Sequence, residues 1–227
     1  MFTLEALAIA FASFEVAWLL SVPLWHTRLS AGRILAGVGI GWLAVSGLLA
    51  WRGFFRGVET FPPPTVYIGL AGAVLLLLVA LLVAPLRTAT YAVGLRTMVA
   101  IHVFRGLVGA AFLSMASKSQ LGPSLGYAGG VAEVLAGVGA LALVVAISRL
   151  HIDRRRRWVL AYAALGTVTL ATTISAWLLS LPSPWQRFGE SALVAKLADF
   201  PYATLPLFFW PLVLVGLLAL FARDSRF

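Results

Sequence analysis

Four ionisable side chains lie well away from the ends of apolar stretches that are long enough to cross a bilayer: Glu15, His102, Arg105 and Glu133. An ionisable group is costly in hydrocarbon, so such residues usually face the interior of a helix bundle and pair with one another. A guanidinium binds carboxylates and other anions, whereas a carboxyl group or an imidazole can exchange protons. These residue types therefore predict an intramembrane site for a small polar or anionic solute, or for protons.

The positions of these residues along their apolar stretches allow them to meet. With the helical rise of 1.5 Å per residue, Glu15 and Arg105 each lie about 16 Å from the predicted outer surface, and Glu133 lies about 10 Å from it. His102 precedes Arg105 by three residues and so falls on the same face of its helix. We expect the helices that carry these residues to meet around Arg105, with one or both glutamates neutralising its charge.

The composition indicates which elements must position this cluster. Of the 227 residues, 61% are hydrophobic and 11% are charged. Soluble domains carry about 25% charged residues, so this composition excludes a water-facing globular surface. Because a helical crossing needs about 20 apolar residues, the sequence predicts an all-α bundle of seven transmembrane helices in a single domain, residues 1–227. The predicted spans are residues 4–24, 32–51, 66–86, 97–116, 126–148, 158–181 and 205–222.

Lysine and arginine are unevenly distributed over the connections between these spans. Apart from Arg105, eleven of the 17 basic residues fall on one side of the predicted bundle and five on the other. The richer side holds Arg28, Arg33, Arg87, Arg96, Arg149, Arg154, Arg155, Arg156, Arg157, Arg223 and Arg226. The poorer side holds Arg52, Arg56, Lys118, Arg187 and Lys196. Because cytoplasmic connections are enriched in basic residues, we predict an external N-terminus and a cytoplasmic C-terminus, in a bacterial cytoplasmic membrane.

Four consecutive arginines, Arg154, Arg155, Arg156 and Arg157, precede the sixth predicted span. Each basic residue near an anionic leaflet contributes about 1 kcal/mol of attraction. We expect these arginines to fix the orientation of the chain, and they form a candidate binding site for anionic lipid headgroups. The net charge of +9 is therefore interpreted as membrane orientation, and no nucleic-acid partner is expected.

Two short motifs suggest an internal repeat. FPPPT (61–65) precedes the third span and FPYAT (200–204) precedes the seventh, while Glu15 and Glu133 lie in the first and fifth spans. Spans 1–3 and 5–7 would then be two copies joined by the fourth span, and many carriers have their site between such repeats. This three-one-three plan resembles that of SWEET-type sugar carriers, although their Pro-Gln dipeptide is absent. The resemblance favours transport and assigns a role to no residue.

The sequence supports neither a metal nor a cofactor. There is no cysteine, and haem ligation would need His26 together with His102, a pairing that we disfavour. The plan resembles that of rhodopsins in topology only, because the last span lacks the lysine of a retinal Schiff base; Lys118 and Lys196 lie in connections. No catalytic motif is present, so enzymatic activity is not expected.

Glycine spacing favours an alternative interpretation. Gly126, Gly130 and Gly137 lie on one face of the fifth span, and Gly106 and Gly109 flank Arg105 in sequence. Small residues at such spacing let helices pack closely. On this interpretation the polar cluster only holds helices together. The protein would then be a non-catalytic membrane subunit or assembly partner of a larger complex, such as one that contains a pigment or a redox centre. A protein partner or a homo-oligomer is compatible with either interpretation.

Overall fold

The structure is a computed structural model that describes residues 3–25, 30–55, 68–69, 71–72, 75, 93–189 and 195–224. These residues form helices, turns and irregular connections, and no β-strand occurs among them. The all-helical character that the composition predicts is therefore present throughout the described part of the chain.

The first half of the chain contributes α1 (Leu4–Trp25) and α2 (Ser30–Trp51). A continuous helical stretch follows from Leu95 to Ser117. It consists of α5 (Leu95–Ala100), a 3₁₀ turn (Ile101–Phe104) and α6 (Arg105–Ser117).

The second half begins with a π-helical turn (Ser124–Gly129) that leads into α7 (Gly130–Ala146), and α8 (Ile152–Ser180) comes next. A 3₁₀ turn (Ala195–Ala198) precedes a second π-helical turn (Leu205–Phe209), which continues into α10 (Trp210–Asp224).

Five helices are long and apolar enough to cross a membrane, and a sixth apolar helix, Leu205–Phe221, is shorter. The five are Leu4–Val22, Gly32–Trp51, Leu95–Ser117, Ser124–Ala146 and Ile152–Ser180. Six of the seven predicted spans therefore coincide with helices. The remaining one, residues 66–86, lies outside the described residues except for 68–69, 71–72 and 75, which are helical. The total of seven spans, and the repeat that includes the third, stay predictions.

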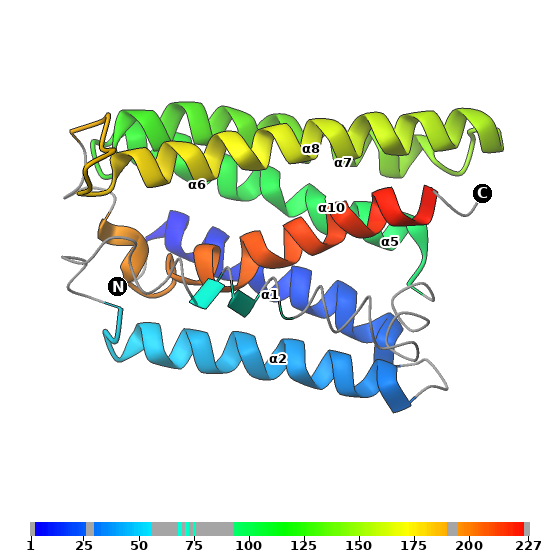
Figure 1. Ribbon diagram of the computed structural model, residues 1–227, viewed down its shortest axis with the longest axis horizontal. Coiled ribbons are helices and arrows are strands. Elements are labelled where there is room, and N and C mark those ends of the chain that lie inside the picture. Colours follow the sequence, from blue (N-terminus) through cyan, green and yellow to red (C-terminus); the bar gives the residue numbers. More distant parts are fainter. Residues whose placement is uncertain are drawn as a thin grey trace.

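The described helices run along the long axis of the molecule and form one bundle (Figure 1). α2 lies at the edge beside α1, and α6, α7 and α8 form the opposite side. The chain ends N and C lie at opposite ends of the bundle. α2 ends near the N-terminal end, whereas α5 begins near the other end (Figure 1). A predicted span at residues 66–86 requires the helix before it to end, and the helix after it to begin, at opposite ends of the bundle, as α2 and α5 do.

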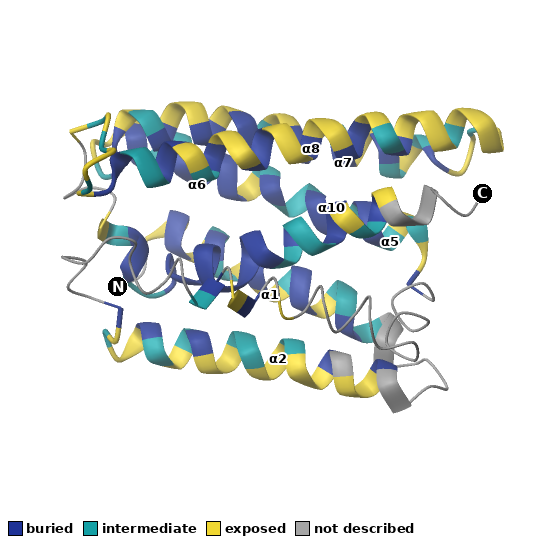
Figure 2. Ribbon diagram, in the orientation of Figure 1, coloured by how far each residue is buried: buried dark blue, intermediate teal, exposed yellow. Residues whose placement is uncertain are grey.

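Large apolar side chains cover the outside of the bundle. On α1, Leu7, Phe11, Phe14 and Trp18 follow helical spacing along one face, and each is at least half exposed. Figure 2 shows exposed residues in the same way along the outer faces of α2, α7 and α8. Such a surface is unfavourable in water but suits lipid tails. The buried polar residues, by contrast, lie in the interior, where other helices can satisfy them.

Candidate intramembrane polar site

Glycines bring α6 and α7 into backbone contact at the level of the polar cluster. A Cβ atom on Gly109 would lie 2.5 Å from the carbonyl oxygen of Gly130, and one on Gly137 would lie 2.5 Å from the Cα atom of Gly106. Neither distance leaves room for a side chain. This close approach sets the distance between Arg105, at the start of α6, and Glu133, in the first turn of α7.

Arg105 and Glu133 form a bidentate ion pair. The Arg105 Nε atom donates to Glu133 Oε2 at 2.6 Å, and Nη2 donates to Oε1 at 3.1 Å. Both side chains are completely buried. A fork of this kind is the geometry in which a guanidinium and a carboxylate bind most strongly. The pair expected between the fourth and fifth predicted spans is therefore present.

The helix α8 supplies the remaining partners of Arg105. Its Nη1 atom donates to the backbone carbonyl of Gly166 at 2.9 Å, and Nη2 donates to Thr169 Oγ1 at 3.0 Å. Together with the two bonds to Glu133, these contacts use four of the five N–H donors of the guanidinium. Three helices, α6, α7 and α8, are thus joined through one side chain.

The sequence interpretation missed Gly166 and Thr169. A stripe of polar and small residues was the available signal, because Tyr162, Gly166, Thr169 and Thr173 recur every three or four residues on one face of α8. Thr173 continues the stripe by donating to the Thr169 carbonyl at 3.1 Å. The face of α8 that meets the arginine is therefore readable from spacing.

His102 lies beside this ion pair, on the 3₁₀ turn that precedes α6. Its side chain is fully buried, and neither Nδ1 nor Nε2 has a hydrogen-bond partner among the described residues. The ring meets Tyr162 edge to face with 5.7 Å between centroids, but the Tyr162 hydroxyl donates to the Ala136 carbonyl. On the other side, a Cβ atom on Gly216 of α10 would lie 3.2 Å from Nε2. An imidazole with two unsatisfied nitrogens is therefore enclosed by three helical segments.

Glu15 does not belong to the same network. Its side chain is half-buried on α1, and among the described residues no ion pair or hydrogen bond joins it to Arg105. Groups of α7 and α8 already occupy four of the five guanidinium donors. The structure thus brings together His102, Arg105 and Glu133 of the four predicted residues.

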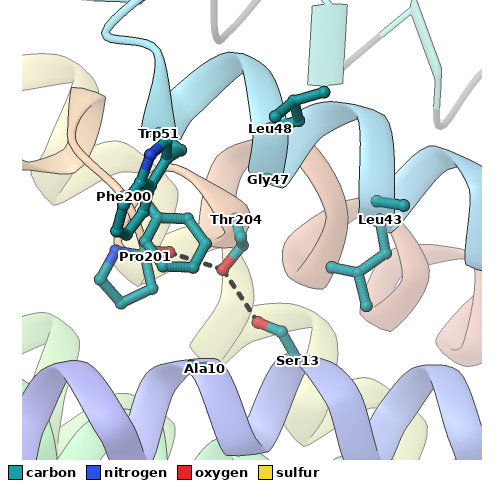
Figure 3. Close-up of a pocket in the computed structure, with 10 residues that line it drawn as sticks. Ala10, Ser13, Leu43, Gly47, Leu48, Trp51, Phe200, Pro201 and Thr204 are labelled. Carbon is teal, nitrogen blue, oxygen red and sulfur yellow. Dashed lines mark hydrogen bonds between the residues drawn. The ribbon is translucent and has the colours of Figure 1, made fainter.

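Ser13, two residues before Glu15 on α1, faces a separate pocket (Figure 3). The pocket has a volume of about 540 Å³ and lies between α1, α2 and residues 200–204. Ser13 Oγ and Thr204 Oγ1 are 3.0 Å apart, and Thr204 donates to the Pro201 carbonyl at 2.7 Å. Because Thr204 uses its proton in that bond, Ser13 must donate to Thr204. The other walls include Leu43, Leu48 and aromatic rings, so the pocket is largely apolar.

The four predicted lipid-binding arginines begin α8. Arg154, Arg156 and Arg157 are exposed and Arg155 is half-buried. The helix starts at Ile152 rather than near residue 158 as predicted, because hydropathy marks only the part of a helix that lies in hydrocarbon, whereas the helical backbone continues through the arginines. His26, the second ligand of the disfavoured haem pairing, lies outside the described residues.

No cluster of three or more histidine, cysteine or acidic side chains suited to a metal ion occurs in the described part of the chain. Comparison of the chain with protein-family models, with curated proteins and with solved structures finds no match.

Proposed function

We propose that this protein is an integral membrane carrier or channel-like protein for a small polar or anionic solute, or for protons, and that His102, Arg105 and Glu133 form its site. The observation that carries the proposal is the buried imidazole of His102, which forms no hydrogen bond within the described part of the chain. Leaving a buried polar atom unsatisfied costs about 1–3 kcal/mol, and a leucine of similar size would avoid this cost. A proton, a water molecule or a solute that reaches His102 in another state of the protein would account for the histidine.

The ion pair supplies a way to couple solute and proton. While Glu133 is ionised, it occupies two of the Arg105 donors. Uptake of a proton by Glu133 weakens this pair, so that Arg105 can bind the anionic group of a solute in its place. Loss of the proton restores the pair and expels the anion. His102, one helical turn before Arg105, would deliver that proton.

The backbone at His102 offers a place for such a change. The 3₁₀ turn Ile101–Phe104 interrupts the helix between α5 and α6, and 3₁₀ segments inside a helix often mark hinges. A small rotation at this turn would move His102 relative to α8 and α10 while α6 stays packed on α7 through its glycines. We propose this turn as the hinge of the site.

One observation favours the alternative, a membrane subunit without transport activity. Arg105 is almost fully satisfied within the bundle, as expected of a group that only holds three helices together. The two proposals differ in what happens to His102 variants, since a purely structural role leaves no use for its ring nitrogens.

Replacement of His102 by leucine separates the two proposals. Wild type and His102→Leu are reconstituted into liposomes that contain the pH dye pyranine, and internal acidification is followed under an imposed proton gradient, with and without formate as a small anionic probe. We expect the variant to unfold at the same or a higher temperature in detergent, because it removes two unsatisfied atoms, and to lose the flux of the wild type. Thr172→Val is the control, because Thr172 is exposed on α8 and donates only to the Val168 carbonyl of its own helix. Equal flux in wild type, His102→Leu and empty liposomes would reject transport of both probes.

A further inference from the structure

A narrow groove runs along the lipid-facing side of the bundle between α7 and α8. It has a volume of about 480 Å³, and its lining includes Gly139, Ala142 and Ala146 of α7 and Trp158 and Leu165 of α8. The small residues on α7 leave the space, and the lining is almost entirely apolar. Such a lining suits an apolar occupant such as a hydrocarbon chain.

Two arginines stand at one end of this groove. Counting 100° per residue from Trp158, Arg154 and Arg155 lie within about 60° of the groove face, whereas Arg156 lies about 160° away. Arg155 donates through Nη2 to the carbonyl of Leu150, which also lines the groove, at 3.3 Å. Its Nε atom is buried and has no hydrogen-bond partner in the segments that the structure describes. A hydrogen-bond donor and a positive charge therefore lie at one end of the apolar groove.

The backbone adds to this positive potential. α8 begins at Ile152, and its N-cap residue, His151, makes no side-chain capping bond. The first N–H groups of a helix carry a partial positive charge and bind phosphate groups readily. The arginines and the helix start thus favour an anion at the position where the groove opens.

We infer that the groove binds one anionic phospholipid, with an acyl chain between α7 and α8 and the phosphate group at Arg154, Arg155 and the first turn of α8. The charge at one end and the apolar lining below it match the two halves of such a molecule. A soluble anion would contact only the arginine end of the site. An anionic phospholipid also fills the apolar groove. The inference does not depend on the proposed function.

Trp158 provides a direct signal for this lipid because it lines the groove. Wild type and Trp158→Phe are placed in nanodiscs of phosphatidylcholine that contain increasing fractions of phosphatidylglycerol with brominated acyl chains, which quench tryptophan on contact. The difference between the two proteins isolates the Trp158 signal. We expect this signal to be quenched at low fractions of brominated phosphatidylglycerol, and only weakly by brominated phosphatidylcholine at the same fractions.

Two double variants with equal charge loss test the site at the arginines. At about fivefold per basic residue, Arg154→Gln/Arg155→Gln should raise the lipid fraction for half-quenching by about 25-fold. Arg156→Gln/Arg157→Gln should shift it much less. Ala142→Phe, which fills the groove from an exposed position, should remove the preference for phosphatidylglycerol while leaving all four arginines. Equal shifts in the two double variants, or unchanged quenching in Ala142→Phe, would overturn the inference in favour of diffuse attraction to the leaflet.

Discussion

Arg105 illustrates how a charge can be kept in the apolar centre of a bundle. Its charge is opposed by Glu133 at 2.6 Å, and two groups of α8 accept further hydrogen bonds. A buried ion pair of this kind adds little net stability compared with apolar residues, but the loss of one partner is expensive because the other stays charged without compensation. The pair is therefore sensitive to single substitutions and tolerant of paired ones.

Arg105→Met should destabilise the protein strongly. It leaves Glu133 buried and unpaired, and the expected loss is about 3–5 kcal/mol in the free energy of unfolding. Arg149→Met is a matched control, since the same substitution there removes the charge of a side chain that is exposed after the end of α7. For this exposed arginine the expected loss is at most about 0.5 kcal/mol. Unfolding in mild detergent by a denaturant titration measures both; equal losses would contradict the account of the buried pair.

The partners of Arg105 could be predicted only in part. The need to neutralise a buried guanidinium pointed to a glutamate, and the depth of Glu133 allowed it. Depth also allowed Glu15, which is not bonded to Arg105 among the described contacts. The sequence states how deep a residue lies but not toward which neighbour it faces, since that depends on the order in which helices pack. Gly166 contributes a backbone carbonyl. Because every residue has a carbonyl, the residue type does not predict which one accepts the bond.

At the scale of helices, the crossing of α6 and α7 decides whether the site can form. Gly106 and Gly137 face each other there, but they are not equivalent. A Cβ atom on Gly137 would meet backbone atoms of α6, including the Cα of Gly106 at 2.5 Å, whereas a Cβ on Gly106 meets only the Cα of Gly137 at 3.6 Å. Backbone atoms cannot move aside as the tip of a side chain can, so only one of the two positions needs glycine.

Gly137→Ala and Gly106→Ala form a matched pair on this crossing. We expect Gly137→Ala to cost about 1–3 kcal/mol, as overpacking usually does, and to lower the flux by separating Arg105 from Glu133. Gly106→Ala adds the same methyl group at ordinary contact distance and should stay near the wild type in both respects. Thermal unfolding in detergent and the pyranine assay measure the two effects. If Gly106→Ala were the more damaging of the two, the helix register at this crossing would be wrong.

Helix positions were more predictable than helix boundaries. Runs of apolar residues located six helices that the structure describes, because the bilayer imposes one length on all of them. The boundary of α8 was missed since a helix can extend beyond the hydrocarbon through charged residues. The 3₁₀ turn at His102 and the π-helical turns at Ser124–Gly129 and Leu205–Phe209 arise from packing, and no periodicity in the sequence announces them.

For the whole molecule, the distribution of charge predicts its orientation in the membrane. The described bundle places the α6–α7 connection at one end and the α7–α8 connection at the other, beside the arginines (Figure 1). The apolar surface of the bundle does not distinguish the cytoplasmic side of the membrane from the external side. Only the unequal distribution of lysine and arginine predicts which end faces the cytoplasm.

Single cysteines test this orientation without background, because the chain contains none. Ser117, at the end of α6, and Ser148, after α7, are both exposed. In bacterial spheroplasts that produce the protein, a membrane-impermeant maleimide should label Ser117→Cys in intact cells and Ser148→Cys only after permeabilisation. The opposite pattern would reverse the predicted orientation and place Arg154 and Arg155 in the outer leaflet.

The double variant Arg105→Gln/Glu133→Gln tests most directly whether the buried ion pair is part of a transport site or only holds helices together. Glutamine retains hydrogen-bonding groups at both positions and removes both charges, so no unpaired charge is left to unfold the protein. In the pyranine assay the account predicts a double variant that is inserted and folded, with wild-type-like unfolding in detergent, but whose flux falls to that of empty liposomes. A folded double variant that carries protons or formate as fast as the wild type would contradict it.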